Sequence, residues 1–139
     1  NWPVIAKALA QKGVITSLAL DDACLRWAFG SLIGNTDMHS GNLACYTDRA
    51  QPFSLAPVYD MTPMGFAPTA PGELPEFRLS LDIIDVVNPS SWARALYLAQ
   101  DYVMRLRTSS LLSRDFAPCV DKLQTHIDQA AERLKRLAP

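Results

Sequence analysis

The sequence lacks an excess of either charge and any long apolar run. Its 139 residues carry 13 Lys and Arg against 14 Asp and Glu, so no net positive charge attracts it to nucleic acid or to an anionic membrane. It contains no apolar run of about 18 residues, the length that a membrane helix needs, and no charged and then apolar leader. We therefore expect no membrane span, no signal peptide and no direct contact with DNA.

Closely spaced cysteines are also missing. Cys24, Cys45 and Cys119 are odd in number, lie far apart and include no Cys-x-x-Cys pair. This pattern argues against a disulfide framework and against a zinc site. It predicts reduced, mostly buried thiols in a cytoplasmic protein.

The length and composition are those of one globular domain. With 49% apolar residues over 139 positions, the chain can bury a core of its own, and we expect residues 1–139 to form a single domain. It begins with Asn1 rather than Met, and residues 2–6 already have the character of a protein interior. We therefore expect the chain to be a fragment whose upstream part is missing.

Apolar residues at helical spacing predict helices at about 3–12, 18–33, 88–106 and 113–137. The second of these is apolar on nearly all faces, which is typical of a buried, central helix. Gly34 is expected to end it. Pro118 should kink or shorten the first turns of the last helix.

Residues 43–47 and 53–56 are predicted to be two short strands, joined by the turn formers of residues 48–52. Residues 61–76 hold too many prolines and glycines for regular structure, so a surface loop is expected there. Residues 77–87 favour neither a strand nor a helix. The expected fold is mainly α, with one small β-hairpin.

The polar segment 34–42 stands between the central helix and this hairpin. Its Asp37 and Asn42 are separated by four residues, and Asp60 follows after the hairpin. Protein kinases use the same three groups: an Asp that accepts the substrate hydroxyl proton, an Asn five positions on that holds Mg²⁺, and a further Asp that holds Mg²⁺. An amide oxygen and a carboxylate suit this hard cation.

Two segments resemble the HipA-like kinases, the toxin components of bacterial toxin–antitoxin modules. In that family the catalytic loop reads Asn-x-Asp-x-His-x-x-Asn, which residues 35–42 match. The metal-binding Asp follows an apolar-Ala-Pro-x-Tyr run, which residues 55–60 match, and residues 61–64 are similar to the continuation in one branch of the family. The resemblance implies the helical C-terminal lobe of a protein-kinase-like fold, with its catalytic loop at 34–42 and its metal-binding segment at 55–61.

The resemblance also assigns roles to single residues. It makes Asp37 the catalytic base, and Asn42 and Asp60 the magnesium ligands. Asn35 and His39 become organisers of the loop. For His39 we further expect a hydrogen bond donated to the transferred phosphate or to the loop backbone.

Two kinase parts are absent from this sequence. None of its six glycines forms a Gly-x-Gly pattern, and its lysines all fall in predicted helices: Lys7, Lys12, Lys122 and Lys135. A kinase needs a glycine-rich loop and a lysine at the phosphates. The resemblance therefore implies that the N-terminal lobe is absent from this chain and that the fragment alone is almost inert.

For the intact protein, the resemblance implies serine/threonine phosphorylation with ATP and Mg²⁺ as cofactors. It implies a protein substrate in translation, an aminoacyl-tRNA synthetase being one candidate. It also implies a small DNA-binding antitoxin as partner, so that DNA is contacted only through that partner.

Three other interpretations remain open from the residues. Asp37, His39 and Asp60 could ligate one ion in a metal-dependent hydrolase. The chain could be a helical interaction module without catalysis. Asp37, Asn42 and Asp60 could also be ordinary turn and capping residues.

Overall fold

A computed structural model of the chain describes residues 1–67 and 81–137. Within these residues four α-helices follow one another: α1 (Trp2–Gln11), α2 (Ser17–Leu32), α3 (Pro89–Thr108) and α4 (Ala117–Leu137). Three 3₁₀ turns, η1 (Ser40–Asn42), η2 (Met64–Phe66) and η3 (Arg114–Phe116), stand between them. The prediction of a mainly α fold is confirmed.

Side-chain caps and glycines set the helix ends close to their predicted positions. Thr16 accepts a hydrogen bond from the Ala19 N–H at 3.0 Å and so begins α2. Asn88 does the same for the Ser91 N–H at 2.8 Å at the start of α3. Gly34 follows the end of α2 with φ +75°, a left-handed conformation that glycine adopts without a steric penalty. The expected end of the central helix is thus confirmed.

The last helix begins later than predicted. Ser113 caps the 3₁₀ turn η3 instead, accepting from the Asp115 N–H at 3.2 Å, and α4 starts at Ala117. Pro118 then occupies the first turn of α4, where its missing N–H would have no helical partner in any case. Pro118 therefore shortens the helix, as expected.

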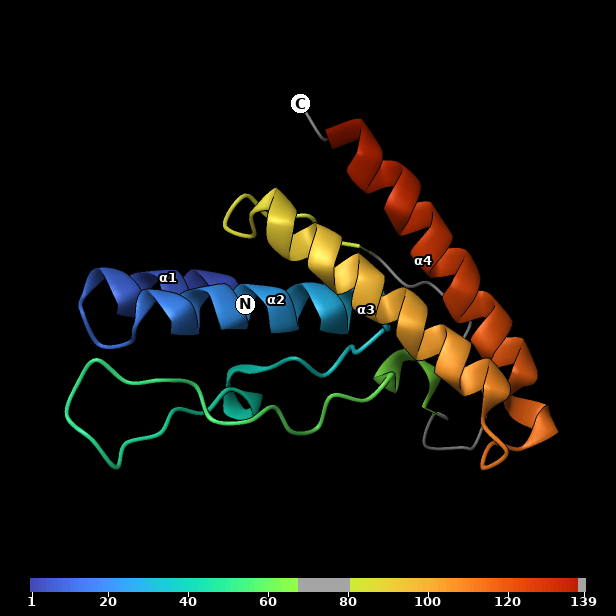
Figure 1. Cartoon of the computed structure of the whole chain (residues 1–139), viewed down its shortest axis with the longest axis horizontal. Helices are drawn as coiled ribbons and strands as arrows, with labels where there is room; N and C mark the ends of the chain where they lie inside the picture. Colours follow the sequence, from blue (N-terminus) through green and yellow to red (C-terminus); the bar gives the residue numbers. More distant parts are fainter. Residues whose placement is uncertain (68–80, 138–139) are drawn as a thin grey trace.

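Helix α2 packs against α1 on one side and against α3 on the other, and α4 packs against α3 (Figure 1). The buried residues of α2 include Cys24, Ala28 and Leu32. They form the larger core together with Trp92 of α3 and Ile127 of α4. A smaller core forms between α1 and α2. The predicted central position of residues 18–33 is confirmed.

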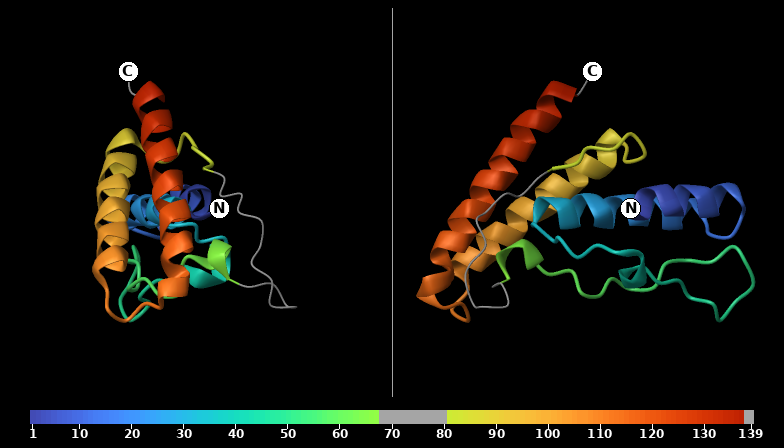
Figure 2. Two further views of the ribbon diagram at one scale, coloured as in Figure 1. Left: turned by 90° about the vertical axis from the view of Figure 1, so that its right-hand side faces the viewer. Right: turned by 180° about the vertical axis from the view of Figure 1, so that it is seen from behind.

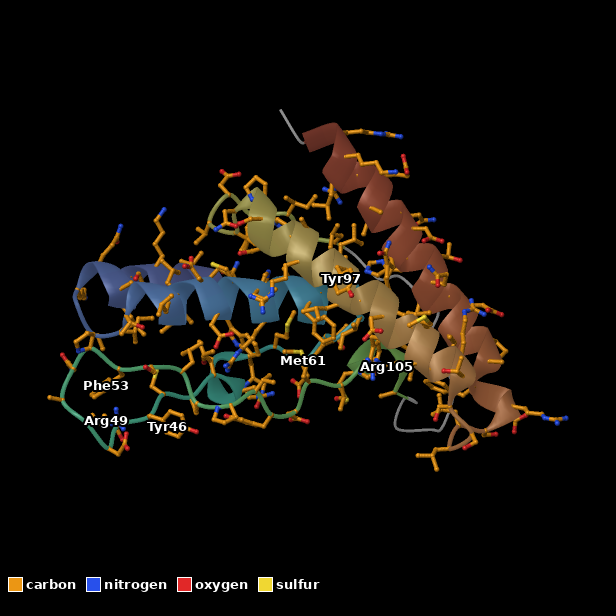
Figure 3. The ribbon with its side chains drawn as sticks, viewed as in Figure 1. Tyr46, Arg49, Phe53, Met61, Tyr97 and Arg105 are labelled. Carbon is orange, nitrogen blue, oxygen red and sulfur yellow. The ribbon has the colours of Figure 1, made fainter. Side chains whose placement is uncertain are left out.

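After α2 the chain turns back and runs out along the α1–α2 pair, then returns towards α3 (Figures 1 and 2). Tyr46, Arg49 and Phe53 lie near the far end of this excursion (Figure 3). Beyond it, η2 contacts the start of the polar loop through a hydrogen bond from the Gly65 N–H to the Gly34 carbonyl at 2.8 Å.

The two predicted strands are not regular strands. Residues 43–47 and 53–56 meet at one antiparallel bridge, Cys45 with Leu55. Backbone hydrogen bonds from Tyr46 to Ser54 (3.0 Å) and from Ala56 to Ala44 (2.8 Å) flank it. Pro52 has no N–H to donate where a further bond of this ladder would form, and a two-stranded ribbon alone is marginal. The turn-back is present, but the ladder is too short for a hairpin of strands.

Other sequence predictions can be compared with the described residues. Of the loop predicted for 61–76, only 61–67 is described, and it contains η2; residues 68–80 lie outside the described residues. Cys24 and Cys119 are buried free thiols and Cys45 is a half-buried one, as predicted. None of the described helices is long and apolar enough to cross a membrane.

Candidate functional site

The polar loop leaves the core directly at the end of α2. Its first turn is fastened to that helix by a hydrogen bond from the Asn35 N–H to the Gly30 carbonyl at 2.8 Å. Asn35 is buried, with 5% of its surface exposed, whereas Thr36 and Asp37 are exposed. The loop therefore begins inside the protein and presents its next residues to solvent.

The side chain of Asn35 joins the two sequence segments of the predicted site. Its Oδ1 accepts from the Asp37 N–H at 2.9 Å, and its Nδ2 donates to the Asp60 carbonyl at 3.3 Å. Because a buried amide must satisfy both ends, this one group fixes the backbone of both aspartates. Asn35 is thus placed where a loop organiser was expected.

Asp37 and Asn42 are joined across the loop. The Asn42 Nδ2 donates to the Asp37 carbonyl at 3.1 Å, so the amide oxygen of Asn42 points away from this bond and remains available as an acceptor. The Asp37 carboxylate accepts no hydrogen bond from the described residues, lies 3.8 Å from His39 Nε2, and belongs to a side chain that is 51% exposed. The loop thus offers one carboxylate and one amide oxygen to a ligand.

His39 is held by the backbone of the same loop. Its Nδ1 accepts from the Gly41 N–H at 3.0 Å, so in the neutral ring the proton lies on Nε2. That nitrogen is 3.8 Å from the Asp37 carboxylate. A Cβ on Gly41 would lie 2.8 Å from the ring carbon Cε1, so glycine is needed beside the imidazole. His39 therefore contacts the loop backbone as an acceptor, not as the donor that we expected.

Asp60 lies in the returning segment with φ +56°, a left-handed conformation that is uncommon for residues other than glycine. Its neighbour Tyr59 reaches the loop, with its hydroxyl donating to the Gly41 carbonyl at 2.6 Å. Strained residues of this kind gather at functional sites. Tyr59 and Asn35 together bring the Asp60 backbone against the loop that carries Asp37 and Asn42.

Helix α2 contacts both the polar loop and the returning segment that carries Asp60. Arg26 pairs with Asp22 on the same helix and donates to the Ala56 carbonyl at 2.6 Å. Met61, in the returning segment, lies beside α2 (Figure 3), and a Cβ on Gly30 would be 3.1 Å from its sulfur. A side chain at position 30 would thus require Met61 to shift slightly.

Sequence analysis missed three supports of the site: Trp2, Arg26 and Tyr59. Trp2 donates its indole N–H to the His39 carbonyl at 2.7 Å. Tyr59 lies within the segment that resembles the kinase motif, and Arg26 is the one basic residue of a mostly apolar helix, so both could have been singled out from the sequence. Trp2 carried none, because its partner is 37 positions away.

The geometry does not support the hydrolase alternative. Within residues 1–67 and 81–137, no three His, Cys, Asp or Glu side chains gather closely enough to hold a metal ion. Asp37, His39 and Asp60 therefore do not form the three-ligand site that such an enzyme would need.

Comparison with known proteins identifies the family of the chain. The HipA-like C-terminal domain family matches residues 3–135. Toxin YjjJ of Escherichia coli (strain K12) is 33% identical over 137 residues, which cover 99% of this chain and 31% of that relative. The chain thus spans about a third of the relative's length. No solved structure matches. The chain belongs to the HipA-like C-terminal domain family.

Proposed function

We propose that this chain is the helical C-terminal lobe of a protein serine/threonine kinase that acts as a toxin. The observation that carries the proposal is the Asn35 amide, which bonds the Asp37 N–H at 2.9 Å and the Asp60 carbonyl at 3.3 Å. These are the two segments that the kinase template requires side by side. The toxin role is supported by the name of the similar relative, Toxin YjjJ.

In this proposal Asp37 receives the proton of the substrate hydroxyl. Its side chain is 51% exposed and its carboxylate accepts no hydrogen bond in the part of the chain that the structure describes, so a substrate side chain can reach it. Its backbone is fixed from both sides, by Asn35 at the N–H and by Asn42 at the carbonyl. Such fixed geometry is what phosphoryl transfer asks of the protein, because the reaction depends on positioning.

Asn42 and Asp60 would hold Mg²⁺, which draws the ATP phosphates into the site. The donors fit this ion: an amide oxygen left free by the bond from Nδ2 to Asp37, and an exposed carboxylate. Magnesium takes few protein ligands and keeps waters and phosphate oxygens, so two donors are enough. His39, in the same loop, would add a donor from Nε2 at the transferred phosphate.

The glycine-rich loop and the phosphate-binding lysine would come from the part of the protein outside this chain. The chain covers 31% of Toxin YjjJ, which leaves room in that relative for a further lobe. The isolated chain is expected to transfer no phosphate. In the intact, cytoplasmic protein, we propose a substrate in translation, such as an aminoacyl-tRNA synthetase, and a DNA-binding antitoxin as partner.

The test is phosphoryl transfer by the full-length protein with radiolabelled ATP and Mg²⁺. Replacing Asp37 by Asn keeps the shape and removes the base, so the transfer rate should fall by about 100-fold or more. Asp48→Asn is the matched control, because Asp48 is exposed on the far excursion of the chain. Its activity should equal that of the wild type.

Equal transfer by wild type and Asp37→Asn would reject the role of Asp37. Absence of any transfer by a folded wild-type protein, over a range of Mg²⁺ concentrations, would favour the non-catalytic interaction module instead.

A further inference from the structure

We propose that Trp2 is a positioning residue for the catalytic loop, acting through its indole N–H. The catalytic part of this inference rests on the proposed kinase function. Trp2 belongs to α1. Its indole N–H donates to the backbone carbonyl of His39, 2.7 Å from Nε1, and not to a side chain that we assign to ATP or Mg²⁺.

The indole itself cannot move freely. Trp2 is 1% exposed and packs edge-on against Trp27 of α2, with the ring centroids 6.4 Å apart and the planes at 64°. An aromatic pair in this arrangement fixes both ring orientations. The N–H is therefore aimed at the loop by the packing of α1 on α2.

The hydrogen bond from Trp2 to the His39 carbonyl is the first of three that connect Trp2 to Asp37. The His39 carbonyl that accepts from Trp2 also accepts from the Asn42 N–H at 3.2 Å. The Asn42 side chain in turn donates to the Asp37 carbonyl at 3.1 Å. Loss of the indole donor thus frees the turn that orients the Asn42 amide and, through it, the backbone of Asp37.

The other two tryptophans show that a buried indole in this protein does not require a hydrogen bond. Trp27 and Trp92 both have buried Nε1 atoms without a hydrogen-bond partner in the described part of the chain. The protein therefore accepts unpaired indoles in its core, and Trp2 alone aims its donor at the loop. Trp92 also provides a control for the chemical change.

The experiment replaces single indole N–H groups in the full-length protein. Incorporation of 3-benzothienylalanine at position 2 keeps the ring shape and exchanges the N–H for sulfur. The same replacement at position 92 removes an N–H that has no partner. Trp2→Phe provides a second, encoded variant, with Trp92→Phe beside it.

Three readouts distinguish positioning from bulk stability. With the isostere at position 2, kcat for phosphoryl transfer should fall about tenfold, the loss expected for one hydrogen bond, and the Mg²⁺ concentration for half-maximal rate should rise. Hydrogen exchange should increase in a peptide covering residues 39–43. The isostere at position 92 should leave all three unchanged, because it removes an N–H that has no partner in the described part of the chain.

Each part of the inference can fail separately. Unchanged exchange over residues 39–43 would overturn the positioning role, whether or not the protein is a kinase. Increased exchange with unchanged kcat, in a protein that Asp37→Asn inactivates, would overturn its catalytic consequence while leaving the proposed function in place. Full activity of Asp37→Asn would reject the role proposed for Asp37 and leave the exchange result over residues 39–43 unaffected.

Discussion

At the scale of single residues, the site depends on side chains that bond backbone rather than on side chains that bond one another. Asn35, Asn42 and Tyr59 donate to the backbone carbonyls of Asp60, Asp37 and Gly41. Among the described residues, such bonds leave the carboxylates of Asp37 and Asp60 without a hydrogen bond. The residues that shape the site are therefore distinct from those that would perform chemistry.

Asn35→Ala should lower the free energy of unfolding by about 2–3 kcal/mol, because two backbone groups lose their partner beside a buried position. The expected loss is measured by urea denaturation. Thr36→Ala, at the exposed neighbouring position, should change stability by less than about 0.5 kcal/mol.

Asn35→Asp separates the two bonds of this amide. The carboxylate can still accept from the Asp37 N–H but cannot donate to the Asp60 carbonyl. We expect Asn35→Asp to be no more stable than Asn35→Ala. A variant as stable as the wild type would show that the bond to Asp60 contributes nothing.

At the scale of elements, α2 organises the molecule. It contributes to both cores, its Arg26 contacts the returning segment, and its last turn delivers the polar loop. Gly30 is the point of closest approach, because a Cβ there would lie 2.2 Å from the Met38 sulfur. Because glycine has no side chain, Met38, which follows Asp37, can pack directly against the helix at this point.

Gly30→Ala should reverse the usual effect of this substitution. In an ordinary helix interior, alanine in place of glycine stabilises by about 1 kcal/mol. Here the added Cβ must displace the Met38 side chain, so we expect a net loss of about 1–2 kcal/mol from overpacking. Thermal and urea denaturation of the variant measure it.

The double variant tests the cause. With Met38→Ala as background the nearest obstacle is gone and the Met61 sulfur, 3.1 Å from the added Cβ, is the one that remains, so Gly30→Ala should destabilise less than it does in the wild type. If Gly30→Ala destabilises equally in both backgrounds, the clash with Met38 is not the reason.

At the scale of the whole molecule, α4 is joined to α2 across 95 positions of sequence by one buried histidine. His126 Nε2 lies 3.2 Å from the Ser31 carbonyl; because a carbonyl only accepts, this nitrogen donates. Burial lowers the pKa of His126 below 6.5, and the bond to Ser31 opposes this shift in part.

The lowered pKa gives a pH dependence of known sign. The unfolded chain binds a proton at His126 more readily than the folded one, so stability is complete above pH 6.5 and falls as the pH drops below this value. The slope for one group is at most about 1.4 kcal/mol per pH unit.

We expect the thermal midpoint of the wild type to fall more between pH 7.5 and pH 5.5 than that of His126→Gln, which keeps a donor but does not titrate. His39 and all carboxylates are present in both proteins, so the difference reports His126. Parallel curves for the two proteins would contradict this assignment.

Much of the fold and the site could be predicted from local pattern. The four helices, the capping Asn88, the stop at Gly34 and the central position of α2 follow from apolar spacing and from turn residues, because these act between near neighbours in sequence. The motif residues Asn35, Asp37 and Asn42 were recognised in the same way. The strands were overestimated because pairing depends on partners beyond the segment, and the two segments form only a single bridge in the described part of the chain.

Local sequence pattern was enough to predict the helices and to locate Asp37, Asn42 and Asp60 in two polar segments. How the helices and these segments contact one another depends on tertiary packing. The packing of α1 on α2 aims the Trp2 indole at His39, and burial of Asn35 ties Asp37 to Asp60. The left-handed backbone of Asp60 also depends on its surroundings. These contacts join residues far apart along the chain, so no local pattern could encode them, and they form only when the core fixes both partners in space.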